Sequence, residues 1–529
     1  MGETVSGGAA VVDALAAHGV RHVFGIPGTH NLEIYRYLPG SGIGHVVPRH
    51  EQGAGYAADG YARVTGGPGV IVTTSGPGIT NAITALATAY ADSVPVLAVS
   101  PGPPSGMVRA DVGWLHEVKD QQAALDAVTA RSIRVESADD VPEIVADVFE
   151  GFASTRPRPV HLEVPVDVLE GEWERRAAPV LPSPEPVGVA HPHGKEVARL
   201  LREAESPVLV VGGGGRRAAA EVLALAEHGV PVLTTVNGKG VLDETHPASL
   251  GASVRLPAAH RVMNDADLLI VVGSELGDSD LWGGVVRPGK PGGRTVVRVD
   301  VEPAQMHKNV TADLDVVGDA AVVLRAAVEA LRADGAAPRS VDPALRSAID
   351  AEAAADGGAW APIQTALREA LPHDTVVAGD SSQVTYYGTV HHWPFTPANR
   401  LLYPTGYATL GYGLPAAVGA KVAEPQRPVV ALVGDGAVMF SIQELATAVE
   451  QRLAIPVVVV DNGGYAEIRE QMVDRGITPQ AVDLPRVDLP ALARALGAHG
   501  VRAETVADLG GHAADALAAD RPTLIHLVL

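Results

Sequence analysis

The chain has 529 residues, too many for a single hydrophobic core, and we expect it to divide into about three domains. It carries 62 acidic and 40 basic residues, and the resulting net charge of −22 argues against nucleic acid or an anionic membrane as a partner. It contains no cysteine, which excludes disulfides, thiol nucleophiles and cysteine-bound metals; since it also shows no basic leader and no apolar run of membrane-spanning length, we expect a cytoplasmic protein.

Helical patterns alternate with short apolar runs along the whole chain, as in α/β domains with doubly wound parallel sheets. We predict three such domains, at residues 1–172, 193–335 and 355–529. A proline-rich stretch at about 173–192 and an Ala/Asp/Pro-rich stretch at about 333–358 predict the connectors between them. The first and third units share a Leu-Ala-Thr-Ala segment before a buried strand, at 86–89 and 445–448, which suggests a duplicated module.

In the first unit, Glu51 follows an apolar run and begins the helical pattern of the segment RHEQGAGYAADGYAR. A carboxylate at the start of a helix commonly compensates the helix dipole, and this is one interpretation of Glu51. The other interpretation is a catalytic carboxylate, which depends on what the third unit binds.

The second unit contains four consecutive glycines, Gly212–Gly215, after an apolar run. The segment resembles a dinucleotide-binding turn, but Arg217 stands where the third glycine of that motif is required, and no acidic residue ends the next strand. We therefore expect a packing turn rather than a NAD site.

The third unit contains a βαβ pattern from Val429 to Tyr465, with polar residues after both strands. Because ligands bind at the carboxyl ends of parallel strands, we expect Asp435 and Asn462 to lie close together. Their oxygens and a turn carbonyl suit Mg²⁺, and the backbone N–H groups of Gly436 and Ala437 would face a phosphate. The alternative is that the Gly-Asp-Gly sequence is only a strand-to-helix turn.

Six segments resemble, in the same order, those of the acetolactate synthase/benzoylformate decarboxylase superfamily of thiamine diphosphate (ThDP) enzymes. They are FGIPG (24–28), RHEQGAGYAADGYAR (49–63), TSGPGITN (74–81), RPVHLEVPVDV (158–168), GLPAAVGA (413–420) and GDG…DNGGY (434–465). The resemblance implies a pyrimidine-binding domain, a middle domain and a diphosphate-binding domain. It also implies a homodimer or homotetramer whose active sites form at the subunit interface.

The resemblance also assigns roles to individual residues. It implies that Glu51 activates the cofactor through a hydrogen bond to the pyrimidine ring, and that Leu410 is the apolar residue that bends the cofactor into a V shape. FAD, which acetolactate synthases bind in the middle domain, is not expected, because Val272–Gly284 lacks their arginine-bearing pattern. The residues implied to hold Mg²⁺ and the diphosphate are Gly434, Asp435, Gly436, Ala437, Asn462 and the carbonyl of Gly464.

The proton-transfer residues differ from those of related enzymes. No histidine stands at Thr73–Gly76, where benzoylformate decarboxylases carry one, and the first unit has no His-His pair like that of pyruvate decarboxylases. His116 replaces a glutamine of acetolactate synthases and is a candidate acid/base, with a structural or solvent-facing role as the alternative. Thr29 and His30 lie in the loop that approaches the substrate carboxylate in the family, and for this loop a helix cap by Thr29 or Asn31 is the alternative.

Glu467 follows the loop Asn462–Gly464, which we call the metal loop. At this position the family places a small or apolar residue of the substrate pocket. An unpaired buried carboxylate is costly, so we expect a cationic partner, which is either Arg469 or a cationic substrate tail. The segment Gly113–Leu125 also resembles that of 5-guanidino-2-oxopentanoate (2-ketoarginine) decarboxylases, and Glu467 would then bind the guanidinium.

Two activities follow from the resemblance. One is the ThDP- and Mg²⁺-dependent decarboxylation of a 2-oxo acid, such as 5-guanidino-2-oxopentanoate, to an aldehyde. The other is an acetolactate synthase-like carboligation of two 2-oxo acids. A non-catalytic subunit is disfavoured, because Glu51, Asp435 and Asn462 are all present.

Overall fold

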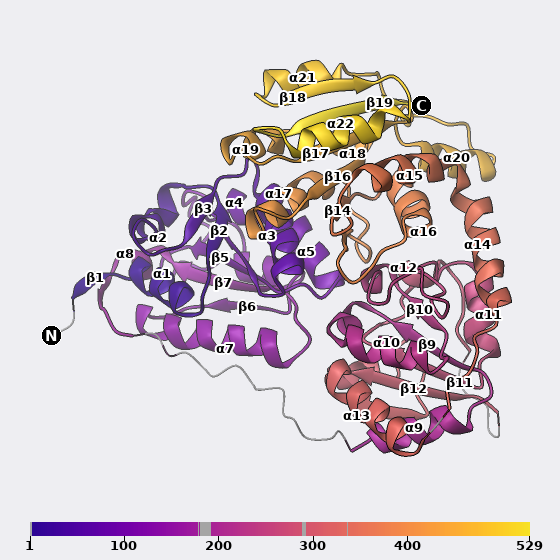
Figure 1. Cartoon of the computed structure of the whole chain (residues 1–529). Coiled ribbons are helices and arrows are strands. Elements are labelled where there is room, and N and C mark those ends of the chain that lie inside the picture. The colour runs from indigo at the N-terminus through magenta and orange to yellow at the C-terminus, as the bar shows by residue number, and fades with distance from the viewer. Residues whose placement is uncertain (1–2, 178, 180–191, 288–292, 336) are drawn as a thin grey trace.

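The computed structural model describes residues 3–177, 179, 192–287, 293–335 and 337–529. Three sheets with helices packed against them form three α/β domains (Figure 1), which confirms the predicted fold class. All three sheets are parallel, and a separate antiparallel pair, β1 (Thr4–Ser6) with β8 (Glu172–Glu174), lies at the edge of the first domain. Strand β8 occupies the start of the predicted first connector, while residues 178 and 180–191 of that connector lie outside the described residues.

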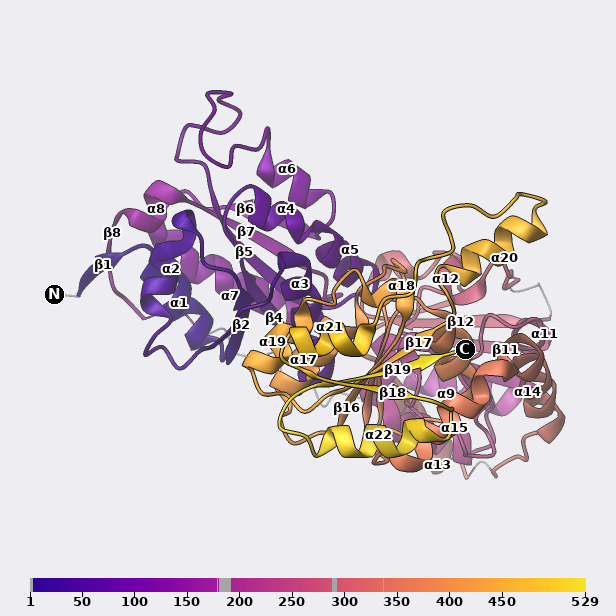
Figure 2. The same ribbon diagram turned by 90° about the horizontal axis from the view of Figure 1, so that it is seen from above.

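The first domain is built on a six-stranded sheet in the order β3-β2-β4-β5-β7-β6. Its strands are β2 (His22–Gly25), β3 (Gly44–Val46), β4 (Gly69–Val72), β5 (Val96–Gly102), β6 (Arg131–Arg134) and β7 (Val160–Pro165). Its helices are α1 (Gly8–Ala17), η1 (Thr29–Asn31), α2 (Leu32–Tyr37), α3 (Glu51–Thr65), α4 (Pro77–Asn81), α5 (Ile83–Ala91), α6 (Gln121–Asp126), η2 (Ala138–Asp140), α7 (Val141–Ser154) and α8 (Val166–Glu170). In Figure 2 the segment between β5 and α6 extends away from this domain.

The middle domain is built on a five-stranded sheet in the order β10-β9-β11-β12-β13. Its strands are β9 (Pro207–Val211), β10 (Val232–Thr234), β11 (Leu268–Val272), β12 (Thr295–Asp300) and β13 (Leu314–Val317). Its helices are α9 (Gly194–Glu203), η3 (Gly213–Ala218), α10 (Ala219–Glu227), η4 (Val236–Gly238), α11 (Pro257–Asp265), α12 (Asp278–Leu281), η5 (Pro303–Gln305) and α13 (Ala320–Ala333). The second predicted connector contains a helix, α14 (Pro343–Gly357), which Asp342 caps by accepting a hydrogen bond from the Ala344 N–H.

The glycines of the expected packing turn do face neighbouring atoms at close range. A Cβ atom on Gly212 would lie 2.3 Å from the Gly273 carbonyl oxygen, and one on Gly215 would lie 2.4 Å from Cγ1 of Val211. Glycine is therefore required at both positions by packing alone.

The third domain is built on a six-stranded sheet in the order β15-β14-β16-β17-β19-β18. Its strands are β14 (Val376–Gly379), β15 (Arg400–Leu402), β16 (Val429–Gly434), β17 (Pro456–Asp461), β18 (His499–Ala503) and β19 (Thr523–Val528). Its helices are η6 (Gly358–Trp360), α15 (Ala361–Ala370), the π-helix η7 (Val384–Thr389), α16 (Val390–His392), α17 (Gly413–Ala423), α18 (Asp435–Val438), α19 (Glu444–Glu450), α20 (Ala466–Asp474), α21 (Leu489–Ala495) and α22 (Asp508–Leu517). The single helix expected after Asp435 is thus two short helices, α18 and α19, joined by turns.

The sheets of the first and third domains have the same topology. If the strands of each six-stranded sheet are numbered in chain order, both sheets read 2-1-3-4-6-5. The two Leu-Ala-Thr-Ala segments lie in α5 and α19, each of which leads into the fourth strand of its sheet. This correspondence supports the duplicated module suggested by the sequence.

The first and third domains of one chain pack through α3 and α17. Glycines allow the two backbones to approach: a Cβ atom on Gly60 would lie 2.2 Å from the carbonyl oxygen of Ala416, and one on Gly419 would lie 1.8 Å from that of Ala57.

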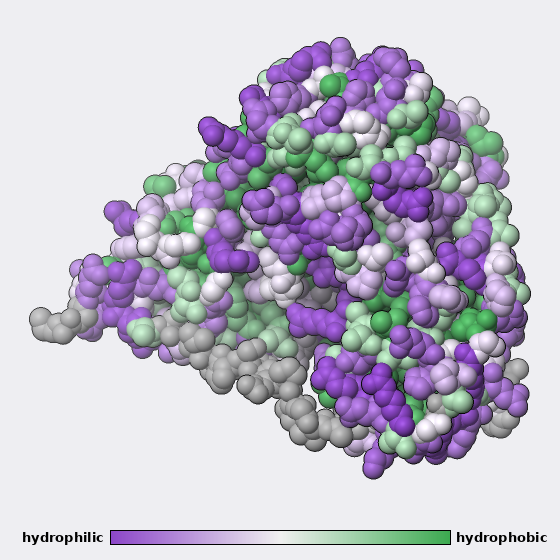
Figure 3. All heavy atoms as spheres, viewed as in Figure 1, coloured by the Kyte–Doolittle hydropathy of each residue, from purple (hydrophilic) through white to green (hydrophobic). Residues whose placement is uncertain are grey.

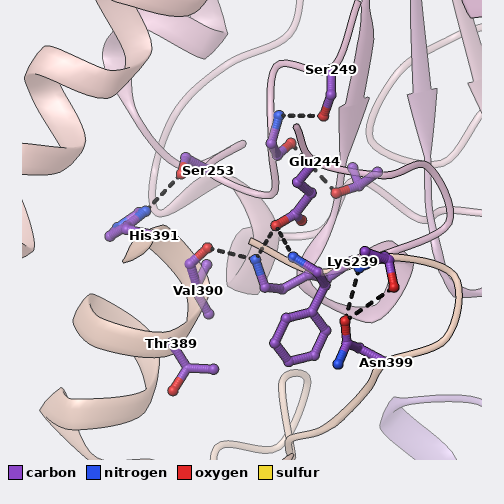
Figure 4. A network of polar contacts seen from close by, with 12 residues as sticks. Lys239, Glu244, Ser249, Ser253, Thr389, Val390, His391 and Asn399 are labelled. Carbon is purple, nitrogen blue, oxygen red and sulfur yellow. Dashed lines mark hydrogen bonds and ion pairs between the residues drawn. The ribbon is translucent and has the colours of Figure 1, made fainter. Parts of the chain in front are cut away.

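A buried ion pair joins the middle domain to the third (Figure 4). The Lys239 ammonium donates to the Glu244 carboxylate (2.6 Å) and to the Val390 carbonyl oxygen (3.1 Å), and the Phe395 N–H donates to Glu244 (2.9 Å). The Lys239 and Glu244 side chains are 1% and 5% exposed. Removal of one partner would leave a buried charge uncompensated, which is costly. Both charged groups also bond to the third domain, so the pair helps to hold the two domains together.

The surface seen in Figure 3 intermixes hydrophilic and hydrophobic residues over all three domains. Within the described residues, no helix is both long enough and apolar enough to cross a membrane.

Candidate active site

Polar groups meet at the carboxyl ends of β16 and β17, as the sequence predicts. The two strands pair in parallel, with Gly434 opposite Val460, so the residues that follow them emerge at the same sheet edge. Asp435 begins α18 directly after β16, and Asn462 directly follows β17. The Gly434 N–H donates to the Ser382 hydroxyl (3.1 Å), which fixes the end of β16 against the neighbouring segment.

Three oxygen atoms converge between these two strand ends. Oδ1 of Asn462 lies 3.3 Å from Oδ1 of Asp435 and 3.1 Å from the carbonyl oxygen of Gly464. Adjacent ligands of an octahedral Mg²⁺ stand about 3 Å apart when the metal–oxygen distances are about 2.1 Å. A carboxylate, an amide oxygen and a backbone carbonyl at this spacing therefore fit Mg²⁺.

The loop that carries these oxygens is held by Asp461, which the sequence did not single out. One of its carboxylate oxygens accepts from the Gly463 N–H (2.9 Å), and the other lies 3.1 Å from Nε2 of His526. Gly464 has a φ of 124°, and a Cβ atom there would lie 2.3 Å from the Val482 carbonyl oxygen. The turn therefore requires glycine, and its shape directs the Gly464 carbonyl toward Asn462.

The electrostatics of the loop favour a cation. Burial, and next the charge of Asp461, raises the pKa of Asp435 above its ordinary value. A divalent cation beside Asp435 would relieve both effects.

Leu410 lies on a turn that is fixed by a buried carboxylate. The Asp380 carboxylate accepts hydrogen bonds from the Gly411 N–H (3.1 Å) and the Gly413 N–H (3.0 Å). Burial raises the pKa of Asp380 to about 6, although these backbone donors oppose the shift. Leu410 itself is half-buried. The role of Asp380 was not apparent from the sequence.

Glu51 is a buried carboxylate at the start of α3. Asn81 donates a hydrogen bond to it (3.0 Å), and Nδ1 of His50 accepts from the Gln52 N–H in capping the same helix. The side chain lies beside the first turn of α4: a Cβ atom on Gly78 would lie 3.5 Å from Oε1 of Glu51. These contacts all lie within the first domain.

Both histidines that the sequence proposed meet at one serine. Nδ1 of His30 lies 2.6 Å from the Ser75 hydroxyl, and Nδ1 of His116 lies 3.3 Å from it. The His30 ring stacks on Trp114, and burial, with the charge of His116 next, lowers the pKa of His30. Ser75 lies just before α4, the helix whose first turn borders Glu51, so the structure brings His30, His116 and Glu51 to one side of the first domain. Ser75 was missed in the sequence because it contributes only through this contact.

Thr29 is exposed at the start of η1 and makes no capping hydrogen bond with its side chain. Asn31 fixes the loop instead: its side-chain oxygen accepts from the Gly28 N–H (2.8 Å), and its amide donates to the Ile26 carbonyl (3.1 Å). A cap by Thr29 is therefore not found, and its hydroxyl is free to face a ligand.

Glu467 is half-buried on α20, and the Arg469 partner considered from the sequence is wrong. Arg469 pairs with Asp483 (2.6 Å) and donates to the Gly463 carbonyl, because residues two positions apart on a helix do not face each other. Within the described part of the chain, neither Glu467 nor Glu470 forms an ion pair with lysine, arginine or histidine.

Neutral donors surround the Glu467 carboxylate instead. The hydroxyls of Tyr386 and Tyr387 each donate to it (3.1 Å), as do the amides of Gln383 (3.2 Å) and Gln471 (3.0 Å). Two consecutive tyrosines reach one carboxylate because they lie in the π-helix η7, a rare conformation often found at functional sites. Burial, and next the charge of Glu467, raises the pKa of Tyr387 to about 12, so both hydroxyls remain donors at neutral pH.

An arginine lies near these tyrosines but is already paired. The Arg255 guanidinium stacks over Trp282 (4.2 Å) and Tyr387 (4.7 Å) and forms an ion pair with Asp356. Its charge is thus balanced by Asp356, and the side chains that it stacks on near Glu467 are aromatic.

Three domain families match the chain. They are the thiamine pyrophosphate enzyme N-terminal TPP binding domain at residues 5–124, the central domain at 195–327 and the C-terminal TPP binding domain at 380–527. Thiamine pyrophosphate (TPP) is another name for ThDP.

The chain is also similar to whole enzymes. It is 41% identical to a probable 2-ketoarginine decarboxylase, AruI, of Pseudomonas aeruginosa, over 94% of this chain and 89% of that protein. It is 32% identical to a probable acetolactate synthase large subunit of Methanocaldococcus jannaschii, over 99% of this chain and 92% of that protein. It is 33% identical to the acetolactate synthase isozyme 2 large subunit of Escherichia coli, over 98% and 94%.

Proposed function

The chain belongs to the thiamine pyrophosphate enzymes, and on this premise we propose that it catalyses the ThDP- and Mg²⁺-dependent, non-oxidative decarboxylation of 5-guanidino-2-oxopentanoate to an aldehyde. The observation that carries the choice of substrate is the pair of carboxylates, Glu467 and Glu470, which have no cationic partner among the described residues. The two share a donor in Gln383, so they lie close together beside the metal loop. A guanidinium supplies the missing charge and donors in one planar group.

We assign the cofactor site from the geometry of the third domain. When bound, ThDP supplies the electron sink for cleavage of the bond between the carboxylate and the keto carbon. The convergent oxygens and the glycine-rich turn support a diphosphate held through Mg²⁺. The residues assigned to this site are Gly434, Asp435, Gly436, Ala437, Asn462 and Gly464, with Leu410 beneath the cofactor and Glu51 at its pyrimidine ring.

Decarboxylation to an aldehyde replaces the carboxyl group by a proton, so the site needs a proton donor. His116 and His30 are our candidates, because both contact the Ser75 hydroxyl and a proton can pass between them through it. Thr29, exposed beside His30, is the candidate donor to the substrate carboxylate. The guanidinium end of the substrate would then lie at Glu467, against Tyr387.

An acetolactate synthase-like carboligation is the second candidate, and it is favoured by the identity of 32–33% with such enzymes over nearly the whole chain. Two pyruvate molecules would leave Glu467 without a cation. Incubation with pyruvate followed by an assay for acetolactate separates the two functions, and abundant acetolactate would contradict the decarboxylase assignment.

A substrate panel with wild type and Glu467→Gln tests the proposed substrate. Because a hydrogen bond to a charged group contributes about 1.5–3 kcal/mol, we expect kcat/KM for 5-guanidino-2-oxopentanoate to fall about 10–100-fold in the variant. The kcat/KM for a neutral 2-oxo acid of similar length should change little. Asp474→Asn, an exposed residue of the same helix, removes the same charge and should have no effect. All rates are to be measured at saturating Mg²⁺.

The proposed substrate is wrong if wild type prefers pyruvate, benzoylformate or branched-chain acids, or if Glu467→Gln slows all substrates equally.

We further propose that the active site forms between two subunits of a homodimer or homotetramer, since the contacts of Glu51 lie within its own first domain. Co-expression of Glu51→Gln and Asp435→Ala chains tests this arrangement. Each variant alone should be inactive, but a mixed dimer would contain one intact site, so random pairing should restore about one quarter of wild-type activity. Inactivity of the mixed species, isolated with two affinity tags, would place Glu51 and Asp435 of the same chain in one site.

A further inference from the structure

One side chain connects the metal loop with the carboxylates of α20. Gln383 is buried at the start of η7, 9% exposed. Its amide nitrogen donates to Glu467 (3.2 Å) and to Glu470 (3.0 Å), while its amide oxygen accepts from Nδ2 of Asn462 (3.1 Å). Gln383 is therefore the only residue seen, among those described, to bond both to Asn462 and to Glu467.

The carboxylates of Glu467 and Glu470 determine which end of the Gln383 amide, its NH₂ or its oxygen, faces them. Ionised carboxylates only accept hydrogen bonds, so the group that faces Glu467 and Glu470 must be the NH₂ of Gln383. Its oxygen then faces Asn462, and the atom of Asn462 that meets this oxygen must be its own NH₂. The orientation of the second amide follows from the first.

The orientation of the Asn462 amide determines which of its atoms faces the metal site. With its NH₂ bonded to Gln383, Asn462 directs Oδ1 toward Asp435 and the Gly464 carbonyl, at 3.3 and 3.1 Å. If the Asn462 amide were turned over, its NH₂ would bond to these two oxygens and its own oxygen would face the Gln383 oxygen. The three-oxygen site would then be replaced by a hydrogen-bonded cluster that binds no cation.

We propose that Gln383 is a positioning residue that selects the metal-binding orientation of Asn462, and that Glu467 and Glu470 impose this orientation through it. Groups that orient a metal ligand without touching the metal commonly change affinity by about 10–100-fold. The inference rests on the proposed function only in taking Asp435, Asn462 and the Gly464 carbonyl as the Mg²⁺ ligands. It makes the charge of the substrate pocket a determinant of metal affinity.

The test is the Mg²⁺ dependence of ThDP binding, measured by calorimetry without substrate. Gln383→Met keeps the volume of the side chain but cannot hold either partner, and we expect it to raise the Mg²⁺ concentration for half-maximal binding about 10–100-fold. Gln471→Met is the matched control: Gln471 also donates to Glu467 (3.0 Å) but is not bonded to Asn462, so its loss should leave Mg²⁺ affinity unchanged. Equal affinity of Gln383→Met and wild type would overturn the proposal.

A second variant keeps Gln383 but removes the two carboxylates that orient its amide. In Glu467→Gln/Glu470→Gln both partners can donate as well as accept, so the Gln383 amide is free to turn, and Mg²⁺ affinity should again fall. Adding Gln383→Met to this double variant should cause no further loss, because all three side chains act through one hydrogen bond. Additive effects, or an unaltered Mg²⁺ affinity in the double variant, would contradict the proposal that Glu467 and Glu470 orient Asn462 through Gln383.

The outcomes also separate this inference from the proposed function. If wild type binds ThDP without a divalent cation, the metal site itself is wrong. If these variants lose Mg²⁺ affinity as expected but 5-guanidino-2-oxopentanoate is a poor substrate, the role of Gln383 is supported and the substrate assignment is wrong.

Discussion

Replacement of Asp435 by alanine is expected to abolish ThDP binding at millimolar Mg²⁺. Loss of a group that only orients a ligand typically weakens metal binding about 10–100-fold, so loss of a ligand itself should exceed about 100-fold. Asp435 also contributes the only charge among the three oxygens that converge at this point, the others being the Asn462 amide and the Gly464 carbonyl. Without that charge, nothing offsets the cost of removing Mg²⁺ from its water shell.

The measurement is calorimetric titration of the apoprotein with ThDP at several Mg²⁺ concentrations, with a parallel series in EDTA. Asp515→Ala, an exposed aspartate of the same domain, is the control for the loss of one negative charge and should bind as wild type does. Thermal unfolding without ligand should be unchanged or slightly raised in Asp435→Ala, since the carboxylate is held at a raised pKa by burial and by Asp461. Wild-type affinity in EDTA, or in the alanine variant, would exclude this loop as the metal site.

The sequence predicts the architecture and the metal loop because both are encoded locally. Short apolar runs and helical patterns predict the alternating strands and helices of all three domains, and the adjacency of two strand ends follows from parallel pairing. The sequence alone therefore predicts that Asp435 and Asn462 lie close together. The helix α14 was missed although Asp342 and the proline after it are ordinary signals of a helix start.

The residues that complete the site could not be predicted in the same way, because their partners are remote in sequence. Gln383 is bonded to Asn462 and to Glu467, and Ser75 to His116, through contacts that only the tertiary structure creates. The π-helix η7 adds one residue to a turn, and no local pattern distinguishes it from an α-helix. The pairing of Tyr386 with Tyr387 on one carboxylate was therefore not foreseeable.

Glu467 shows how structure narrows an alternative that sequence leaves open. The sequence allowed either Arg469 or a substrate cation as its partner, and the structure commits Arg469 to Asp483. What remains is a carboxylate with four neutral donors, a set that stabilises negative charge without neutralising it. None of these donors carries a positive charge, so the carboxylate can still take a cationic ligand.

Replacement of Glu51 by glutamine is expected to leave ThDP bound but to slow exchange of its C2 proton about 10²–10⁴-fold, the usual range for loss of an acid–base group. The substitution preserves size, and the new amide oxygen can still accept from Asn81, so the start of α3 should remain folded. What it removes is the charge that would hold a proton at the pyrimidine ring. Exchange is measured by quenched hydrogen–deuterium labelling of the bound cofactor, and binding by titration at saturating Mg²⁺.

The same variant decides between the two interpretations of Glu51. If the carboxylate only compensates the helix dipole, glutamine should cost about 0.3–1 kcal/mol of stability and leave exchange unaltered. Glu143→Gln is the matched control, because Glu143 lies in the first turn of α7, exposed and outside the proposed site. Both variants should lose similar stability, but Glu51→Gln alone should lose exchange. Wild-type exchange in Glu51→Gln would assign this buried carboxylate to the helix and leave activation of the cofactor to another residue.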